Sequence, residues 1–215
     1  MAKLVKMIRL SGTATAKSGI SVGGDKTTLG PGGVDNPVIK NPMTYVPYIP
    51  GSSFKGRMRA IFESMTTVYN DKGEVTTTDP CGCGKKDCLI CTMFGAHKNT
   101  KAACGPARLI FKDMVLEKPY AENPNIVENK QETAINRRTG TANGGTLRPR
   151  ERVVEGAVFD YEIMVKVYEG DNVNKIIDEV KRGLRLIELN GIGAKTSCGY
   201  GQIEFGDMKQ EEIKL

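Results

Sequence analysis

Hydrophobic and polar positions alternate with a period of two in several stretches of the chain, which is the pattern of a β-strand with one buried face. In the first stretch, Leu4, Ile8 and Leu10 stand among polar neighbours. The stretch AVFDYEIMVKVYE alternates along its whole length. We therefore expect four strands, at residues 3–16, 107–117, 157–169 and 202–205.

Two other stretches repeat apolar residues every three or four positions, as helices with one buried side do. In the first helix, Ser52 or Ser53 is placed to cap the start. The expected buried positions are Phe54, Met58, Ile61, Phe62 and Met65 in the first helix, and Val173, Ile176, Ile177, Val180, Leu184 and Ile187 in the second. The order strand, helix, strand, strand, helix, strand predicts an α+β fold of the ferredoxin-like or RRM-like kind.

Three long segments exceed this minimal plan. Residues 17–50 are rich in glycine and proline, residues 70–104 hold a cysteine cluster, and residues 119–152 are mostly polar. Loops of this length inside a compact domain are usually functional or disordered. Because no internal repeat or domain boundary is visible, we expect residues 1–215 to form a single domain with these three insertions.

Composition changes this picture only a little. Hydrophobic content of 39% and charged content of 26% are ordinary for a globular protein. The start of the chain lacks the apolar core of a signal peptide, and no apolar run is long enough to cross a bilayer. We therefore expect a cytoplasmic protein without a membrane partner. The net charge of +6 mildly favours a polyanionic partner.

Four cysteines, in the sequence CGCGKKDCLIC, indicate a metal site. Cys-x-Cys followed by Cys-x-x-Cys lets four thiolates converge tetrahedrally, and soft sulfur ligands favour Zn²⁺. Gly82 and Gly84 permit the tight turns that this spacing needs. A filled four-sulfur site is structural, because it has no open position; His97 is a possible substitute ligand, and reduced cysteines without metal are the alternative. The predicted ligands are Cys81, Cys83, Cys88 and Cys91.

The glycine-rich stretch GIGAKTSCGYG, residues 191–201, does not have the features of known nucleotide-binding loops. Ala194 precedes Lys195 where a P-loop needs glycine, and the stretch follows a helix instead of a strand. What remains is a chain of flexible backbone amides with one lysine, able to approach a phosphate backbone closely. A purely structural turn explains these residues equally well.

Basic residues gather at two further places. Lys55, Arg57 and Arg59 lie near the positive start of the first helix, where phosphates bind, although a solvated basic face is the alternative. The segment 119–152 has few large apolar groups, so a projecting strand pair there would order against something large and anionic, with a disordered loop as the alternative. Its basic residues are Lys130, Arg137, Arg138, Arg148, Arg150 and Arg152.

The stretch GPGGVDNPVIKNP, residues 30–42, holds a single acid, Asp35, among glycines and prolines. Such a loop can hold a carboxylate rigidly and in the open. From the residues alone, Asp35 before Asn36 and Pro37 also suits a simple Asx-turn.

Three stretches together resemble the RAMP superfamily of CRISPR-associated RNA-binding proteins. They are GVDNPVIKNP with YIPGSSFKGRMRAIFE, then ETAINRRTGTANGGTLRPRERV, and finally LNGIGAKTSCGYGQIEF. Within the superfamily the resemblance is to the repeated backbone RNase subunit, subunit three, of type III-A effector (Csm) complexes. It covers most of the chain in the right order.

The resemblance implies an RRM-like fold, copies that polymerise head to tail along a CRISPR RNA, and other Csm subunits as partners. It implies that a thumb within residues 119–152 wedges into the guide–target duplex, and that Asp35 lies where the target RNA is cut, with a divalent cation such as Mg²⁺. RNA supplies its own nucleophile, the 2′-hydroxyl, so one carboxylate that takes a proton or anchors hydrated Mg²⁺ suffices.

Two other functions are compatible with the resemblance. The first is a non-catalytic RNA-binding scaffold, as in type III-B complexes or other RAMP backbone proteins. The second is a solitary guide-processing endonuclease that depends on His97. The expected RNA-binding residues are Ser52, Ser53, Lys55, Arg57, Arg59, Arg137, Arg138, Gly191, Gly193, Lys195, Gly199 and Gly201.

Overall fold

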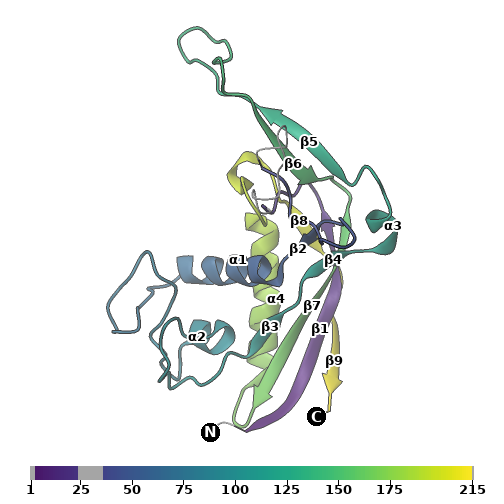
Figure 1. The fold of residues 1–215 in the computed structure, drawn as a ribbon. Helices are drawn as coiled ribbons and strands as arrows, with labels where there is room; N and C mark the ends of the chain where they lie inside the picture. The colour runs from purple at the N-terminus through teal and green to yellow at the C-terminus, as the bar shows by residue number, and fades with distance from the viewer. Residues whose placement is uncertain (1–2, 24–35, 215) are drawn as a thin grey trace.

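The computed structural model describes residues 3–23 and 36–214 (Figure 1). The candidate acid Asp35 therefore lies outside the described residues. Within them, the chain forms a large antiparallel sheet, a small separate sheet, and helices that pack against one face of the large sheet. This mixture is the α+β class that the hydrophobic pattern predicts.

The large sheet has seven strands in the described part of the chain, and its two longest strands, β1 (Leu4–Ala16) and β7 (Val158–Tyr168), lie at its centre. They run antiparallel and pair along nearly their whole length. The other strands are β2 (Tyr48–Ile49), β3 (Leu109–Phe111), β4 (Met114–Leu116), β8 (Ile203–Phe205) and β9 (Lys209–Ile213). The order is β2–β4–β7–β1–β8, while β3 also pairs with β7 and β9 with β1.

The two predicted helices are α1 (Gly51–Ser64) and α4 (Val173–Asn190). In the chain, α1 follows the first predicted strand and α4 follows the third, β7. The spatial order β4–β7–β1–β8 is the strand order of the ferredoxin-like plan. The predicted ferredoxin-like fold is therefore confirmed.

The core lies between the large sheet and the two long helices. Phe54 of α1 is fully buried, and its ring lies 5.1 Å from that of Phe111 and 6.2 Å from that of Tyr161. Helices α1 and α4 approach closely because Gly183 has no side chain: a Cβ there would lie 2.7 Å from Sδ of Met58. The apolar stripes of both helices and the alternate residues of β1 and β7 thus form one core. The expected burial of Met65 is wrong, because α1 ends at Ser64 and the Met65 side chain is 46% exposed.

Residues 107–117 form two strands instead of the single predicted strand. The register along β7 slips by one residue between β3 and β4, which is typical of a β-bulge. The turn there places a carboxylate oxygen of Asp113 2.7 Å from the N–H of Gly51. Asp113 therefore serves the start of α1, and the predicted side-chain cap by Ser52 or Ser53 is wrong.

Strand β9 was not expected, because its sequence KQEEI has no alternating pattern. It pairs with the first half of β1, where ion pairs join Lys6 to Glu212 at 2.7 Å and Arg9 to Glu211 at 2.9 Å. The short helices α2 (Leu89–Phe94) and α3 (Lys118–Ala121) and a 3-10 helix (Thr196–Cys198) were also not expected.

The small sheet consists of β5 (Val127–Glu132) and β6 (Arg148–Val153), and we call residues 127–153 the hairpin arm. It projects from the top of the molecule in Figure 1, whereas residues 70–104, the cysteine segment, lie at the lower left around α2. The arm is the strand pair that the basic segment predicts, and not a disordered loop. In the described part of the chain, no helix is both long and apolar enough to cross a membrane.

Candidate nucleic-acid interface and metal centre

The hairpin arm carries most of the charges of its two strands on one face. In the register of β5 and β6, Lys130 lies opposite Arg150, and Glu128 and Glu132 lie opposite Arg152 and Arg148. Because side chains alternate with a period of two, these six residues share a face. Like charges directly opposite each other destabilise a strand pair. The Lys130–Arg150 pair therefore indicates a face that is suited to an anionic partner.

This face meets the glycine-rich loop at Tyr200. The ring of Tyr200 is buried, and the cationic groups of Lys130 and Arg152 each lie 5.0 Å from its centroid. The Tyr200 hydroxyl donates to Oε1 of Glu132 at 2.6 Å, and Nζ of Lys195 pairs with the other carboxylate oxygen. We call this cluster the arm–loop junction. It comprises Lys130, Glu132, Arg150, Arg152, Lys195 and Tyr200.

The electrostatics of the junction keep Glu132 ionised. The hydrogen bond from Lys195, and then that from Tyr200, lower the pKa of Glu132 below its ordinary value. Burial, followed by the negative charge of Glu132, raises the pKa of Tyr200 to about 12. At neutral pH, Tyr200 is therefore a hydrogen-bond donor and Glu132 a charged acceptor.

The glycines of the loop have structural reasons to be glycine. Gly191, Gly193, Gly199 and Gly201 all have positive φ, and a Cβ on Gly193 would lie 2.6 Å from the carbonyl oxygen of Ser21. The amides of Gly191, Gly199 and Gly201 donate to carbonyl oxygens within the protein. The groups that this loop directs toward the arm are therefore the side chains of Lys195 and Tyr200.

The chain on both sides of residues 24–35 is held at the base of the arm. Asn36 forms a bridge with Arg150, and the amide of Glu151 donates to the carbonyl of Asn36 at 3.0 Å. The Glu151 carboxylate accepts from the amide of Val38 at 3.1 Å and pairs with Lys40 at 3.0 Å. On the other side, Gly23 forms a bridge with Val38. The sequence neighbours of the Asp35 loop thus lie along strand β6 of the arm, next to the residues that carry its basic face.

The basic residues at the start of α1 are not brought together as an open cradle. Arg57 donates to the carbonyl oxygens of Asn190 at 2.5 Å and Gly191 at 2.7 Å, which closes the end of α4. Arg59 pairs with Glu63 at 2.8 Å. Burial, and then the charge of Arg59, lower the pKa of Lys55. Arg57 and Arg59 therefore hold the fold together.

The residues at the end of the arm are exposed. Arg137 and Arg138 lie in the turn that closes it, where the side-chain oxygen of Asn136 accepts from the amide of Arg138 at 2.9 Å. The two large apolar residues of this turn region, Ile135 and Leu147, are 55% and 58% exposed. The tip therefore presents cations and apolar groups together, away from the core.

The cysteine segment gathers four sulfur atoms into a cluster of metal-binding size. The sulfur atoms of Cys81, Cys83, Cys88 and Cys91 all lie within 4.8 Å of one another, and the closest pairs are 3.6–3.8 Å apart. Four thiolates around Zn²⁺ at about 2.3 Å lie about 3.8 Å apart in a tetrahedron. The arrangement therefore fits a metal ion that is bound by four sulfur atoms.

Thiols in this cluster have different pKa values, because they differ in burial and in the hydrogen bonds they make. The hydrogen bond from Cys91 lowers the pKa of Cys88 to about 5, whereas burial raises the pKa of Cys83 to about 11. Cys88 also caps α2, because its sulfur accepts from the amide of Cys91 at 3.5 Å. Four neighbouring thiolates repel one another, so a cation is needed to hold all of them charged.

Cys81, and not His97, completes the group of four sulfur ligands in the described chain. The backbone amide of His97 donates to the carbonyl of Cys81 at 3.0 Å. Helix α1 holds Cys81 as well: Arg59 donates to the same carbonyl at 2.8 Å, and Glu63 accepts from the Cys81 amide at 2.8 Å. The sequence analysis did not predict this connection, because it assigned Arg59 to the basic start of the first helix.

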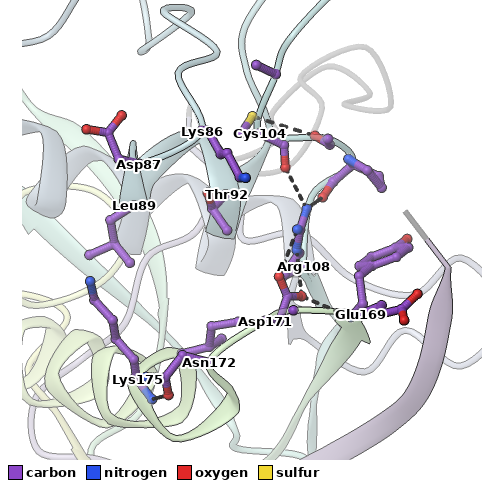
Figure 2. Close-up of a pocket in the computed structure, with 16 residues that line it drawn as sticks. Lys86, Asp87, Leu89, Thr92, Cys104, Arg108, Glu169, Asp171, Asn172 and Lys175 are labelled. Atoms are coloured by element: carbon purple, nitrogen blue, oxygen red, sulfur yellow. Dashed lines mark hydrogen bonds and ion pairs between the residues drawn. The ribbon is translucent and has the colours of Figure 1, made fainter. Parts of the chain in front are cut away.

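Figure 2 shows a cavity of about 870 Å³ between the end of the cysteine segment and the turn from β7 to α4. The buried Arg108 in its wall donates to both carboxylate oxygens of Asp171 at 2.9 Å and to the carbonyl of Cys104 at 2.8 Å. Burial alone would raise the pKa of Asp171, but the hydrogen bonds from Arg108 and the Tyr168 amide lower it. Arg108 thus acts as a clamp between the cysteine segment and the β7–α4 turn. Its charge is neutralised by Asp171, so it is not available to a ligand in the cavity.

Comparison with known proteins gives the chain its family. The model of the RAMP superfamily matches residues 13–204. A protein of Methanothermobacter thermautotrophicus, named CRISPR system Cms endoribonuclease Csm3, is 36% identical over 94% of this chain and 85% of its own length. Proteins of the same name from Methanocaldococcus jannaschii and Streptococcus thermophilus are 36% and 32% identical, over 93% and 96% of this chain and 79% and 90% of their own lengths.

Two solved structures share the fold. A Csm3–Csm4 subcomplex of the type III-A CRISPR-Cas interference complex matches 99% of this chain and 82% of the other, with a TM-score of 0.61 and 24% identity. A type III-B Cmr-beta complex bound to cognate target RNA matches 97% of this chain and 61% of the other, with a TM-score of 0.64 and 16% identity. The ferredoxin-like sheet with its basic arm is thus that of a RAMP protein. The chain belongs to the RAMP superfamily and, within it, to the Csm3 family.

Proposed function

We propose that this chain is a backbone subunit of a type III-A CRISPR effector complex. In that role, copies of the chain bind CRISPR RNA head to tail, together with other Csm subunits, and cleave complementary target RNA at regular intervals through Asp35. The observation that carries the proposal is the position of the chain that flanks the Asp35 loop. Asn36 and Gly23 lie at the base of the basic arm, as the bridges of Asn36 with Arg150 and of Gly23 with Val38 indicate.

Binding of RNA follows from the charge of the arm. Its basic face overlies the glycine-rich loop, so a phosphate backbone that runs through the junction meets cations from both sides. Ile135 and Leu147 at the exposed tip are suited to wedge against a base step, with Arg137 and Arg138 beside them to contact phosphates. This is the thumb that we expect to enter the guide–target duplex, on a single RRM-like domain.

Cleavage needs little more than one carboxylate, because RNA carries its own nucleophile. The 2′-oxygen attacks the adjacent phosphorus, the bond from phosphorus to the 5′-oxygen breaks, and that oxygen leaves with a proton taken from water. Asp35 takes the proton of the 2′-hydroxyl or holds hydrated Mg²⁺, which stabilises charge on the phosphate when it is bound. The relatives at 32–36% identity are named endoribonucleases, which supports this assignment. The cysteine cluster has a separate, structural role with Zn²⁺.

The test is cleavage of labelled complementary RNA by the assembled, guide-loaded complex with Mg²⁺. The native complex is expected to cut at regular intervals, and an Asp35→Ala complex is expected to bind the target but leave it intact. Asp178→Ala is the matched control, because Asp178 is an exposed acid of α4. Cleavage that persists in the Asp35 variant would reject the role of Asp35. A native complex that binds but does not cut would identify a scaffold instead.

A further inference from the structure

Glu132 occupies an unusual place in a face that is otherwise suited to bind anions. Its carboxylate receives the Lys195 ammonium on one oxygen and the Tyr200 hydroxyl on the other, at 2.6 Å. The side chains of Glu132 and Lys195 are 23% and 35% exposed, so solvent reaches the pair. A cation and a hydroxyl donor that converge on two oxygens of one anion form the arrangement that also binds a phosphodiester.

We propose that Glu132 is an internal stand-in for an RNA phosphate, and that bound RNA displaces it from Lys195. The proposal rests on the RNA-binding function proposed above. A phosphodiester and a carboxylate each carry a single negative charge and two oxygens that accept hydrogen bonds. Exchange of one for the other therefore leaves the charge of the junction unchanged and requires no proton transfer, since Glu132 is already ionised.

The hairpin arm provides a second partner for the displaced carboxylate. Glu132 lies directly opposite Arg148 in the register of β5 and β6, on the same face. In antiparallel strands, the Cβ atoms of residues opposite each other are roughly 4.5–5.5 Å apart, which is close enough for their side chains to form an ion pair. Glu132 thus has two cationic partners, Lys195 on the glycine-rich loop and Arg148 on its own arm. When RNA binds at the loop, Glu132 pairs with Arg148 instead of Lys195.

The free and bound states differ in how the arm is tied to the loop. In the free chain, the Glu132–Lys195 pair joins β5 to the loop and holds the cationic groups of the junction together. Without Glu132, those cations would repel one another across a site that is partly withdrawn from water. Glu132 therefore stabilises the junction before RNA binds, and it lowers the affinity of the junction for RNA.

The test uses the full-length chain and a fluorescein-labelled, unstructured single-stranded RNA, with binding followed by anisotropy from 50 to 300 mM salt. Glu132→Gln keeps the shape and the acceptor for Tyr200 but removes the charge. In RNA-bound native protein the displaced Glu132 neutralises Arg148, so the variant leaves Arg148 free to contact one more phosphate. One additional phosphate contact changes the slope of log K against log salt by about −0.7, which is about fivefold in affinity at 0.1 M. We expect Glu132→Gln to bind about fivefold more tightly and with this steeper slope. Glu122→Gln, an exposed acid next to α3, is the charge-matched control and is expected to change neither quantity.

A double-variant cycle decides whether the gain passes through Lys195. Lys195→Gln alone is expected to weaken binding and flatten the salt slope, and Glu132→Gln is expected to give a clearly smaller gain in that background, because only its pairing with Arg148 is then lost. A gain of equal size without Lys195, or an unchanged or weaker affinity of Glu132→Gln with an unchanged melting temperature, would overturn the proposal while the proposed function stands. A native chain that binds no RNA would overturn both.

Discussion

The cysteine segment and the hairpin arm are both additions to the same ferredoxin-like plan, yet they use their side chains in opposite ways. In the cysteine segment, Cys81, Cys91, Met93 and Phe94 are at most 2% exposed. In the arm, most of β5 and β6 is exposed or half-buried, and Val153 at its base is the residue of β6 that is buried.

The difference indicates that the cysteine segment is built for stability and that the arm is suited to binding. The two largely buried arginines that contact the cysteine segment are matched, since Arg108 pairs with Asp171 and Arg59 pairs with Glu63. The charges of the arm include the like pair Lys130 and Arg150, directly opposite each other. A segment that satisfies its own polar groups needs no partner, whereas like charges held together are favourable only when an anion is present.

The largest expected effect is the loss of the metal site. Cys88→Ser, or a strong chelator on the native protein, is expected to cost several kcal/mol of unfolding free energy, because metal binding and local folding are linked. Elemental analysis and thermal unfolding measure the change, and hydrogen exchange is expected to rise first in residues 70–104. Cys198→Ser is the control, since Cys198 is exposed and lies outside the cluster. Unchanged stability with no zinc detected would contradict the metal site.

The next largest effect is expected at the clamp between the cysteine segment and the β7–α4 turn. Arg108→Met leaves Asp171 buried without its cation, at a cost of about 3 kcal/mol in unfolding free energy. The pKa of Asp171 is lowered in the folded state, so its contribution is complete above about pH 3.9, where an unfolded aspartate ionises. It is lost as the pH falls through the lower, folded value.

The measurement for this clamp is urea unfolding of both proteins between pH 7 and pH 2.5. The stability gap between the native chain and Arg108→Met is expected to shrink toward the acid end. An Asp171→Asn variant serves as the control, because it should show little of this acid dependence. A gap that stays constant with pH would refute the assigned ion pair.

A smaller effect on stability is expected to distinguish Arg57 from Lys55, two basic residues of α1 that look alike in the sequence. Arg57→Ala removes hydrogen bonds to the carbonyls of Asn190 and Gly191, and we expect it to cost about 2 kcal/mol of unfolding free energy. Lys55→Gln is expected to leave the melting temperature nearly unchanged. If Arg57→Ala left stability intact and altered only the salt dependence of RNA binding, Arg57 would be a phosphate ligand and not a helix-end clamp.

The smallest effect on stability is expected in the arm. Arg150→Gln removes one of two opposed cations, so the free energy of unfolding should change by no more than about 0.5 kcal/mol. RNA binding should nevertheless weaken, with a salt slope smaller by about 0.7. Anisotropy and thermal melts on the same preparation compare the two quantities. A large loss of stability would contradict the contrast between the arm and the cysteine segment.

Much of the fold was readable from local pattern. The alternation in residues 157–169 and the apolar stripe from Ile176 to Ile187 correspond to β7 and α4, since each element buries one face against one core. Strand β9 was not readable. Four of its five residues are exposed, and backbone pairing and ion pairs with β1, which is distant in sequence, hold it in place.

The candidate site divides in the same way. Spacing within eleven residues identified the four cysteines, because a metal site built from one short segment leaves a local signal. The basic residues of the arm were also identified, but Tyr200, Glu132 and the clamp residue Arg108 were not. Asp35 was proposed from a resemblance and, outside the described residues, stays a prediction.

Local sequence pattern was enough to predict the long strands and helices, the cluster of four cysteines and the sign of the charge on the arm, because these depend on residues close together in the chain. The partner of each basic side chain depends instead on the tertiary fold. Arg57 and Lys195 look equally available in the sequence, but their partners lie more than sixty positions away. Only folding brings such partners within hydrogen-bond distance. The partner of a charged side chain therefore depends on the fold, because electrostatic interactions are strongest between groups a few ångströms apart.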